Sequence, residues 1–113
     1  MRHLIISIFL AAFFLLSTGC KEPEPIRIGF VGELTTRAAG LSTSGRDGFL
    51  LAVEEVNARG GIKNRAVEGL VQDTRMHSAT ARHAVRTLAK RKVSAIIGPM
   101  TSQTAVTIAP EIN

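Results

Sequence analysis

Residues 93–102, VSAIIGPMTS, join a strand pattern directly to a helix start. The first half is an apolar run of strand length whose β-branched residues suit a sheet interior, so we expect a short buried strand. Pro99 cannot donate a hydrogen bond to a neighbouring strand, so the strand should end at this point. Thr101 and Ser102 are both good N-cap residues for a helix over 103–109.

This turn is the first candidate for a binding site. A helix start offers free N–H groups and a partial positive charge, and both attract anions such as carboxylates. In open parallel sheets, ligands sit beyond the carboxyl ends of the strands. If the remaining strands of the chain are parallel to this one, the turn lies at the binding edge of the sheet.

The composition predicts one folded domain with a basic surface. The chain has 113 residues, 45% of them hydrophobic and 20% charged, with a formal net charge of +5. Nucleic-acid binding would favour aromatic side chains for stacking, but the chain has no Trp or Tyr, and three of its five Phe lie within the first 14 residues. We therefore expect a solvated basic surface and no nucleic-acid partner.

Residues 1–19 have the pattern of a bacterial export signal. A short basic start precedes an apolar segment, 4–16, which is interrupted only by Ser7 and is short for a membrane span. Small residues then lead to Cys20, as in the signal peptides of bacterial lipoproteins, although Ser17 occupies the position where a large aliphatic residue is usual.

Cys20 is accordingly predicted to become the lipidated first residue of the mature protein, anchored in the membrane by its acyl chains. Residues 20–25, with two Pro and two Glu, would form a stiff polar tether. An ordinary signal peptide with an incidental cysteine is the alternative. A single cysteine allows no intrachain disulfide and no paired-cysteine metal or redox site.

After the tether, strand and helix patterns alternate. Strands are expected over 26–31, 66–73 and 93–97, and helices from Phe49 to the Gly60–Gly61 pair, over 79–92 and from Ser102 onward. The first helix carries an apolar stripe of Phe49, Ala52, Val53 and Val56. Residues 33–44 are expected to form a polar loop that lines a site. Strands apolar on both faces, alternating with helices, predict an α/β fold with a parallel sheet covered by helices.

Four motifs in this order carry a family resemblance. They are residues 26–35 (IRIGFVGELT), 48–62 (GFLLAVEEVNARGGI), 71–73 (VQD) and 96–102 (IIGPMTS). Together they resemble the beginning of the branched-chain amino acid substrate-binding proteins of ABC transporters, which have the type I periplasmic binding fold. The resemblance covers residues 26–113 and implies two lobes that close over a small ligand. Members are several times longer, so these residues are expected to form an incomplete N-terminal lobe, with strand order 2-1-3.

The resemblance also implies roles for individual residues. Ser102 matches the serine that faces the α-carboxylate of the ligand, although Ser102 could instead serve only as a helix cap. Thr101 and Met100 lie on the same turn and are expected to contribute backbone contacts. Leu41 stands in the loop where relatives place an aromatic residue against the ligand side chain. Arg37 is expected to be a solvated loop charge rather than a partner for an acidic ligand.

Other chemistries are disfavoured by spacing. The glycines near residue 30 lack the spacing of a dinucleotide-binding turn, and no phosphate-binding GxxxxGK[ST] motif occurs. His77 and His83 are six residues apart, with no cysteine or paired acid at metal-ligand spacing. Asp73 could cap a turn or line the cleft, and we favour the turn. We expect no catalytic residue, metal or cofactor.

The sequence thus predicts the extracytoplasmic amino-acid-binding component of an ABC transporter, held at the cell envelope by a lipid anchor and delivering its ligand to a permease. A ligand-sensing receptor domain of the same fold is the alternative, because fold does not fix function. A truncated, non-functional lipoprotein is a third possibility. Without a second lobe to cover the ligand, the isolated chain is expected to bind branched-chain amino acids weakly or not at all.

Overall fold

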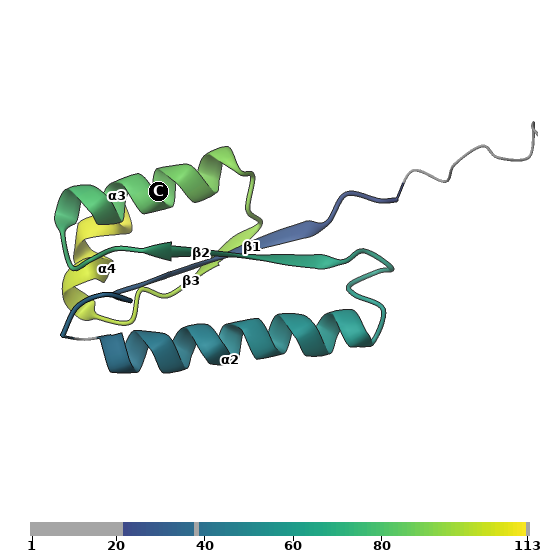
Figure 1. Ribbon diagram of the computed structural model, residues 1–113. Helices are drawn as coiled ribbons and strands as arrows, with labels where there is room; N and C mark the ends of the chain where they lie inside the picture. Colours follow the sequence, from purple (N-terminus) through teal and green to yellow (C-terminus); the bar gives the residue numbers. More distant parts are fainter. Residues whose placement is uncertain (1–21, 38, 113) are drawn as a thin grey trace, which may run out of the picture.

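The computed structural model describes residues 22–37 and 39–112. Along the chain the elements are β1 (Ile26–Gly32), α2 (Ala39–Ala58), β2 (Val67–Asp73), α3 (Ser78–Lys90), β3 (Ala95–Ile97), α4 (Ser102–Ile108) and the short 3₁₀ helix η1 (Ala109–Glu111). Figure 1 shows α2 along one face of the sheet, with α3 and α4 on the other. No helix in the described part of the chain is long and apolar enough to cross a membrane.

The sheet is parallel, with strand order β2-β1-β3. β1 pairs with β2 along its whole length, from Ile26 opposite Val67 to Gly32 opposite Asp73. Its other edge pairs with the three residues of β3. The predicted α/β class, the parallel sheet and the central place of the first strand are all confirmed.

Alternate side chains of β1 enter two separate cores. Phe30 faces α2 and stacks on Phe49, with ring centroids 5.7 Å apart. Val31 faces the other way and joins a buried cluster from α3 and α4 that includes Leu88 and Ile108. Gly29 lies on the same side as Val31, and a Cβ atom there would come within 2.6 Å of a Leu88 methyl group. This two-residue period explains why the strand is apolar on both faces.

The α2–β2 connection is fixed by Asn57 and two glycines. Gly60 and Gly61 have φ angles of +92° and +78°, which glycine adopts without a steric penalty, so the helix ends there as predicted. The Asn57 amide nitrogen donates to the Val67 carbonyl (2.8 Å), and its amide oxygen accepts from the Val67 N–H (2.7 Å). Asn64 also adopts a left-handed conformation, with φ of +60°.

Two predicted boundaries are wrong. Helix α2 begins at Ala39, so the last six residues of the expected loop 33–44 are helical. Helix α3 ends at Lys90 rather than at Lys92, because Lys92 has a left-handed φ of +55° that no α-helix can continue through.

The expectation of a buried third strand is also wrong. β3 is three residues long and begins at Ala95, and only its central residue, Ile96, is partly buried. Ile97 is 46% exposed. The reason is topological, because β3 is the edge of the described sheet and pairs only with β1.

Candidate functional site

The loops that follow the three strands meet at the carboxyl edge of the sheet. The Thr74 N–H, just after β2, donates to the Gly32 carbonyl at the end of β1 (2.9 Å). Glu33, the next residue, contacts Thr101, which lies in the loop after β3. The edge predicted to hold the binding site is therefore a single packed assembly of the β1–α2, β2–α3 and β3–α4 loops.

Glu33 is the centre of this assembly. Its side chain is fully buried, with 0% exposure. One carboxylate oxygen accepts a hydrogen bond from the Ser42 hydroxyl (2.9 Å), and the other accepts one from the Thr101 hydroxyl (2.9 Å). The Glu33 N–H donates to the same Ser42 hydroxyl (3.0 Å). One carboxylate thus joins the end of β1, the first turn of α2 and the residue that caps α4.

Glu33 is held in its charged form. Burial by itself raises the pKa of a carboxyl group, but the hydroxyls of Thr104, Thr101 and Ser42 stabilise the anion and outweigh burial, so the pKa of Glu33 lies below its ordinary value. Hydrogen bonds to an ionised acceptor are stronger than those between neutral groups. The carboxylate therefore acts as a rigid bridge between three segments of the site.

Asp73 makes a second bridge, between the loops after β1 and β2. Its carboxylate accepts hydrogen bonds from the Leu34 N–H (2.9 Å), the Thr35 hydroxyl (2.5 Å) and the Arg75 N–H (2.9 Å). The hydrogen bond from the Arg75 N–H, two residues along the chain, closes the turn in which we expected Asp73 to serve. Burial opposes ionisation, but the hydrogen bonds of Thr35, Arg75 and Leu34 prevail and lower the pKa of Asp73.

The turn after β3 uses its side chains in three different ways. The N-cap of α4 is Thr101, whose hydroxyl accepts from the Thr104 N–H, so Ser102 is not the capping residue. Ser102 is the first residue of α4 and is exposed to solvent. Met100 packs inward, because a Cβ atom on Gly45 of α2 would lie 2.8 Å from its methyl group.

Leu41 lies on α2 and not in a loop, contrary to our expectation, and it is 59% exposed. Leu41 is the chain neighbour of Ser42, and Ser102 is the chain neighbour of Thr101. The Glu33 carboxylate binds both Ser42 and Thr101, so Leu41 and Ser102 belong to two segments that the same carboxylate joins.

Arg37, at the tip of the β1–α2 loop, is exposed, as a solvated loop charge would be. His77 and His83 are exposed as well. In residues 22–37 and 39–112, no three His, Cys, Asp or Glu side chains come together in a way that could hold a metal ion. The exposed groups of the edge thus include the Ser102 hydroxyl, the apolar Leu41 and the cations Arg37 and Arg75.

Glu33 is the important residue that sequence reasoning missed. Its partners lie nine and 68 positions away, so no local spacing marks them. The available signal was an acidic residue placed directly after a buried strand, where an unpaired charge would be costly. That signal indicates a partner but does not say which residues provide it.

A family model described as "periplasmic binding protein" matches residues 25–113. The chain belongs to the periplasmic binding protein family. The recognised resemblance and the type I periplasmic binding fold are thereby confirmed. A search of curated proteins found no significant match.

Solved structures of periplasmic binding proteins superpose on most of the chain. The branched-chain amino acid transporter substrate-binding protein LivJ of Streptococcus pneumoniae, solved with isoleucine, is 36% identical over 74% of this chain, with a TM-score of 0.70. The leucine-binding protein LivK of Thermotoga maritima is 29% identical over 76% of the chain (TM-score 0.66), and a fatty acid ABC transporter substrate-binding protein of Thermomonospora curvata is 29% identical over 79% (TM-score 0.70). The match covers 24%, 24% and 23% of those chains, respectively.

This periplasmic binding protein chain therefore spans about a quarter of the length of the structures that it matches. The matched proteins are substrate-binding proteins rather than enzymes, and the family is one of the cell exterior or periplasm. The predicted signal peptide, 1–19, and the predicted lipidation site, Cys20, lie outside the described residues.

Proposed function

We propose that residues 26–113 supply one wall of the ligand cleft of an extracytoplasmic substrate-binding protein, which delivers a branched-chain or related amino acid to an ABC permease. The observation that carries this proposal is the exposed Ser102 at the carboxyl edge. Ser102 directly follows Thr101, which caps α4 and is held by its hydrogen bond to the Glu33 carboxylate. A hydroxyl in this position can donate a hydrogen bond to the α-carboxylate of a bound amino acid.

Two further features support an amino acid with an apolar side chain. The 36% identical structure of LivJ holds isoleucine, and LivK is a leucine-binding protein. Leu41, exposed on the first turn of α2, would contact the ligand side chain, while Thr101 and Met100 would contribute backbone groups only. Their side chains are already engaged, Thr101 with Glu33 and Met100 with Gly45.

The same proposal includes the anchor. Residues 1–19 would be a lipoprotein signal peptide, Cys20 the acylated first residue of the mature chain, and 20–25 the tether. Residues 22–25 have no regular secondary structure, as a tether requires. Acyl chains at Cys20 would keep the protein at the cell envelope, where the permease also lies.

A chimera tests the ligand. Residues 26–113 replace the matching segment of Streptococcus pneumoniae LivJ, and binding is measured by calorimetry against isoleucine, leucine, valine, glutamate and a fatty acid. We expect isoleucine, leucine or valine to bind most tightly. In that chimera Ser102→Ala should weaken binding about tenfold or more, because it removes a hydrogen bond to a charged group.

The matched control is Ser44→Ala, which removes another exposed serine hydroxyl, one that donates within α2 to the Gly40 carbonyl (3.1 Å). It should leave affinity unchanged. A folded chimera that prefers glutamate or the fatty acid would contradict the proposed ligand class. Equal affinities of the Ser102→Ala variant and the parent would contradict the role of Ser102. In the 113-residue chain alone, millimolar isoleucine should shift the amide NMR signals around Ser102, with no tight binding.

A further inference from the structure

The opposite edge of the sheet, where the strands begin, carries a basic surface that the ligand site does not use. Arg27 is the second residue of β1, and Lys63 and Arg65 precede β2. The basic run from Lys90 to Lys92 begins at the last residue of α3 and precedes β3. The Ser94 N–H donates to the Arg27 carbonyl (2.7 Å), so the end of α3 lies beside the start of β1. We call Arg27, Lys63, Arg65, Lys90, Arg91 and Lys92 the amino-edge surface.

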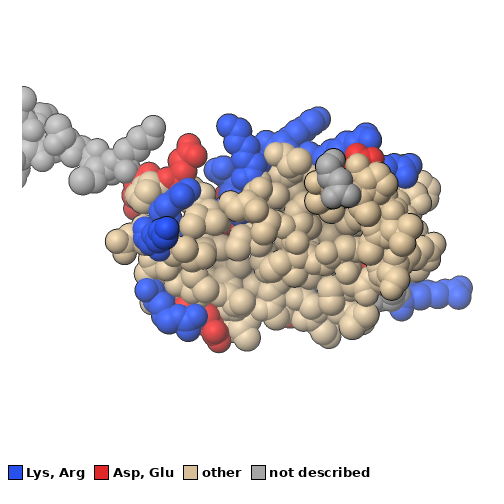
Figure 2. Space-filling model, turned by 180° about the vertical axis from the view of Figure 1, so that it is seen from behind, with Lys and Arg blue, Asp and Glu red and all other residues tan. Residues whose placement is uncertain are grey.

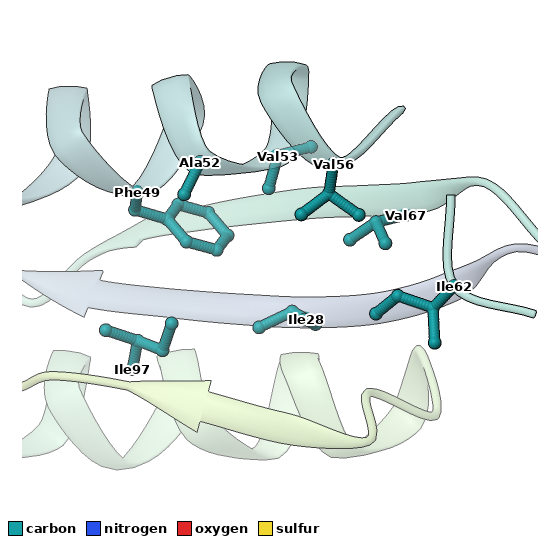
Figure 3. A pocket seen from close by; sticks show the side chains of 8 residues that line it. All are labelled: Ile28, Phe49, Ala52, Val53, Val56, Ile62, Val67 and Ile97. Carbon is teal, nitrogen blue, oxygen red and sulfur yellow. The ribbon is translucent and has the colours of Figure 1, made fainter. Parts of the chain in front are cut away.

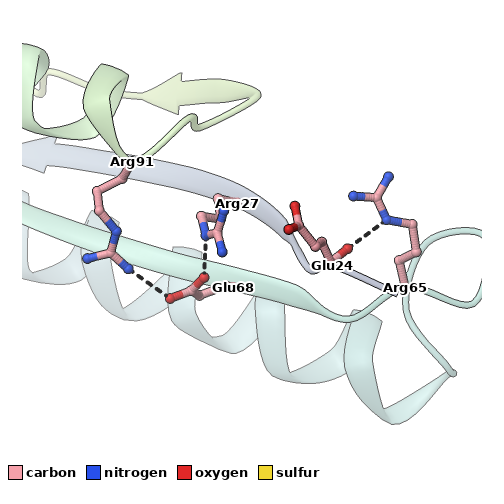
Figure 4. A network of polar contacts seen from close by, with 5 residues as sticks. All are labelled: Glu24, Arg27, Arg65, Glu68 and Arg91. Atoms are coloured by element: carbon pink, nitrogen blue, oxygen red, sulfur yellow. Dashed lines mark hydrogen bonds and ion pairs between the residues drawn. The ribbon is translucent and has the colours of Figure 1, made fainter. Parts of the chain in front are cut away.

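Positive charge is in excess on this surface. Glu68 is shared by two cations, Arg27 at 2.8 Å and Arg91 at 3.3 Å, so one carboxylate faces two guanidinium groups (Figure 4). Arg65 donates to the main-chain carbonyl of Glu24 (2.8 Å), and in Figure 4 the Glu24 carboxylate points away from it.

The three lysines of the amino-edge surface are exposed and form no ion pair with any described residue. They are Lys63, Lys90 and Lys92. On the other edge of the sheet the balance differs, because Arg75 lies 3.8 Å from the Asp73 carboxylate and Arg46, on α2, lies 2.7 Å from Asp47, which leaves Arg37 as the exposed cation there that forms no ion pair with a described residue. The charge is therefore polarised along the direction of the strands, with the excess at their amino ends.

The basic character continues over α3. Residues 74–110 contain no Asp or Glu, and Glu111 is shared between Arg82 (4.0 Å) and Arg86 (2.9 Å). Figure 2 shows Lys and Arg side chains gathered along the α3 side of the molecule, whereas at the end near the grey N-terminal segment Lys and Arg stand beside Asp and Glu. Such a surface attracts polyanions over roughly the Debye length, about 8 Å in physiological salt.

The position of the tether favours a membrane as the polyanion. The chain enters the sheet at Ile26, next to Arg27, and Cys20 is only six residues earlier. Even fully extended, six residues reach about 20 Å. An acylated Cys20 would thus hold the amino-edge surface close to the lipid headgroups. A basic patch beside a lipid anchor is a common second signal for membrane binding.

We infer that the amino-edge surface lies against anionic phospholipid headgroups and holds the lobe with its carboxyl edge, and therefore Ser102, directed away from the membrane. The inference rests on the proposed acylation of Cys20 for its orientation, but the affinity of the surface for anionic lipid is independent of the acyl chain. The acylation of Cys20 and the affinity of the surface for anionic lipid are therefore measured in separate experiments.

The full chain carrying Cys20→Ser, which cannot be acylated, is floated with vesicles of phosphatidylcholine and of phosphatidylcholine mixed with phosphatidylglycerol. We expect the anionic vesicles to bind more protein, with the excess lost in high salt. The variant Lys63→Gln/Lys90→Gln/Lys92→Gln should lower the anionic-over-neutral binding ratio at least about tenfold. The control Arg37→Gln/Arg46→Gln/Arg75→Gln removes the same charge elsewhere and should lower the ratio much less.

Circular dichroism confirms that both variants are folded before comparison. Equal losses in the two variants would mean that only net charge matters, and no loss in either would mean that the surface is not used; each result overturns the inference. Metabolic labelling of the unmodified chain with palmitate tests the anchor separately. Labelled Cys20 with unchanged vesicle binding by the lysine variant would reject the surface and leave the proposed lipoprotein intact. Unlabelled Cys20 with lysine-dependent vesicle binding would reject the anchor alone.

Discussion

The buried carboxylate of Glu33 makes the fold sensitive to acid. Its pKa is lower in the folded chain than the ordinary value of 4.5, so its stabilisation is complete above pH 4.5 and is lost as the pH falls through the lower, folded value. The variant Glu33→Gln should therefore have a shallower loss of melting temperature below pH 4.5. At neutral pH it should be less stable by about 1–3 kcal/mol in urea denaturation, because buried hydroxyls lose a charged acceptor.

Glu54→Gln is the control for this prediction, because Glu54 is an exposed carboxylate on α2. Its acid profile should match that of the unmodified chain. Some acid sensitivity should remain in Glu33→Gln, because the pKa of Asp73 is also lowered, from an ordinary value of 3.8, and its contribution is lost at still lower pH. Identical acid profiles for Glu33→Gln and the parent would mean that Glu33 does not carry the effect.

Gly98 is required by the turn after β3. Its φ is +98°, and a Cβ atom there would lie 2.2 Å from the Val31 carbonyl oxygen, on the central strand. We expect Gly98→Ala to lower the free energy of unfolding by about 1–3 kcal/mol or more, from backbone strain and this clash.

Gly48→Ala is the matched control, because Gly48 lies within α2 and a Cβ atom there meets nothing within 4 Å. This change should stabilise the chain by roughly 0.5–1 kcal/mol, since alanine is the better helix former. Urea denaturation of the two variants measures both effects. Equal stabilities would show that the turn can relax around a Cβ atom at position 98.

Among the elements, the start of α2 shows where prediction from the sequence stopped. Residues 39–45 read AGLSTSG, with two glycines and three hydroxyl residues, all weak helix formers. The turn is helical because distant residues fix it, as Ser42 binds Glu33 and Gly45 leaves room for Met100. Tertiary contacts of this kind override local propensity and leave no periodic pattern in the sequence.

Ser42→Ala should therefore loosen the first turn of α2 selectively. The hydroxyl bonds to both the carboxylate and the N–H of Glu33, and its loss removes about 1 kcal/mol or more of local stability. Amide hydrogen exchange in the first turn of α2 should become about tenfold faster, with little change in β2. Ser44→Ala, which affects only a bond within the helix, serves as the control. Equal exchange in the two variants would contradict the bridging role of Ser42.

The candidate site was predictable only in its local part. Pro99 and the hydroxyl residues after it mark the end of a strand and the start of a helix, so Thr101 and Ser102 could be placed at the carboxyl edge from the sequence. Which of them caps α4 could not, because both are good caps. The bridge through Glu33 depends on the closing of the sheet, which brings residue 33 to residue 101.

In the molecule as a whole, the α2 face of the sheet is only partly covered. A groove runs beside α2 (Figure 3), lined by Ile28, Phe49, Ala52, Val53, Val56, Ile62, Val67 and Ile97. The predicted apolar stripe of α2 forms one wall, and the edge strand β3 contributes Ile97 to the other. Its surface is entirely apolar. A groove of this composition, open to solvent, offers apolar surface for an aromatic molecule to contact.

The 113-residue chain should therefore bind the dye 8-anilinonaphthalene-1-sulfonate in its folded state, with binding centred on this groove. Ile97→Thr keeps a β-branched residue in β3 but replaces apolar surface, and it should reduce the fluorescence of the bound dye. Val106→Thr is the control, because Val106 is 77% exposed on α4 and is not among the residues that line the groove. It should leave the fluorescence unchanged. Equal reductions would place the dye on exposed apolar surface in general, and the groove would then have no special affinity.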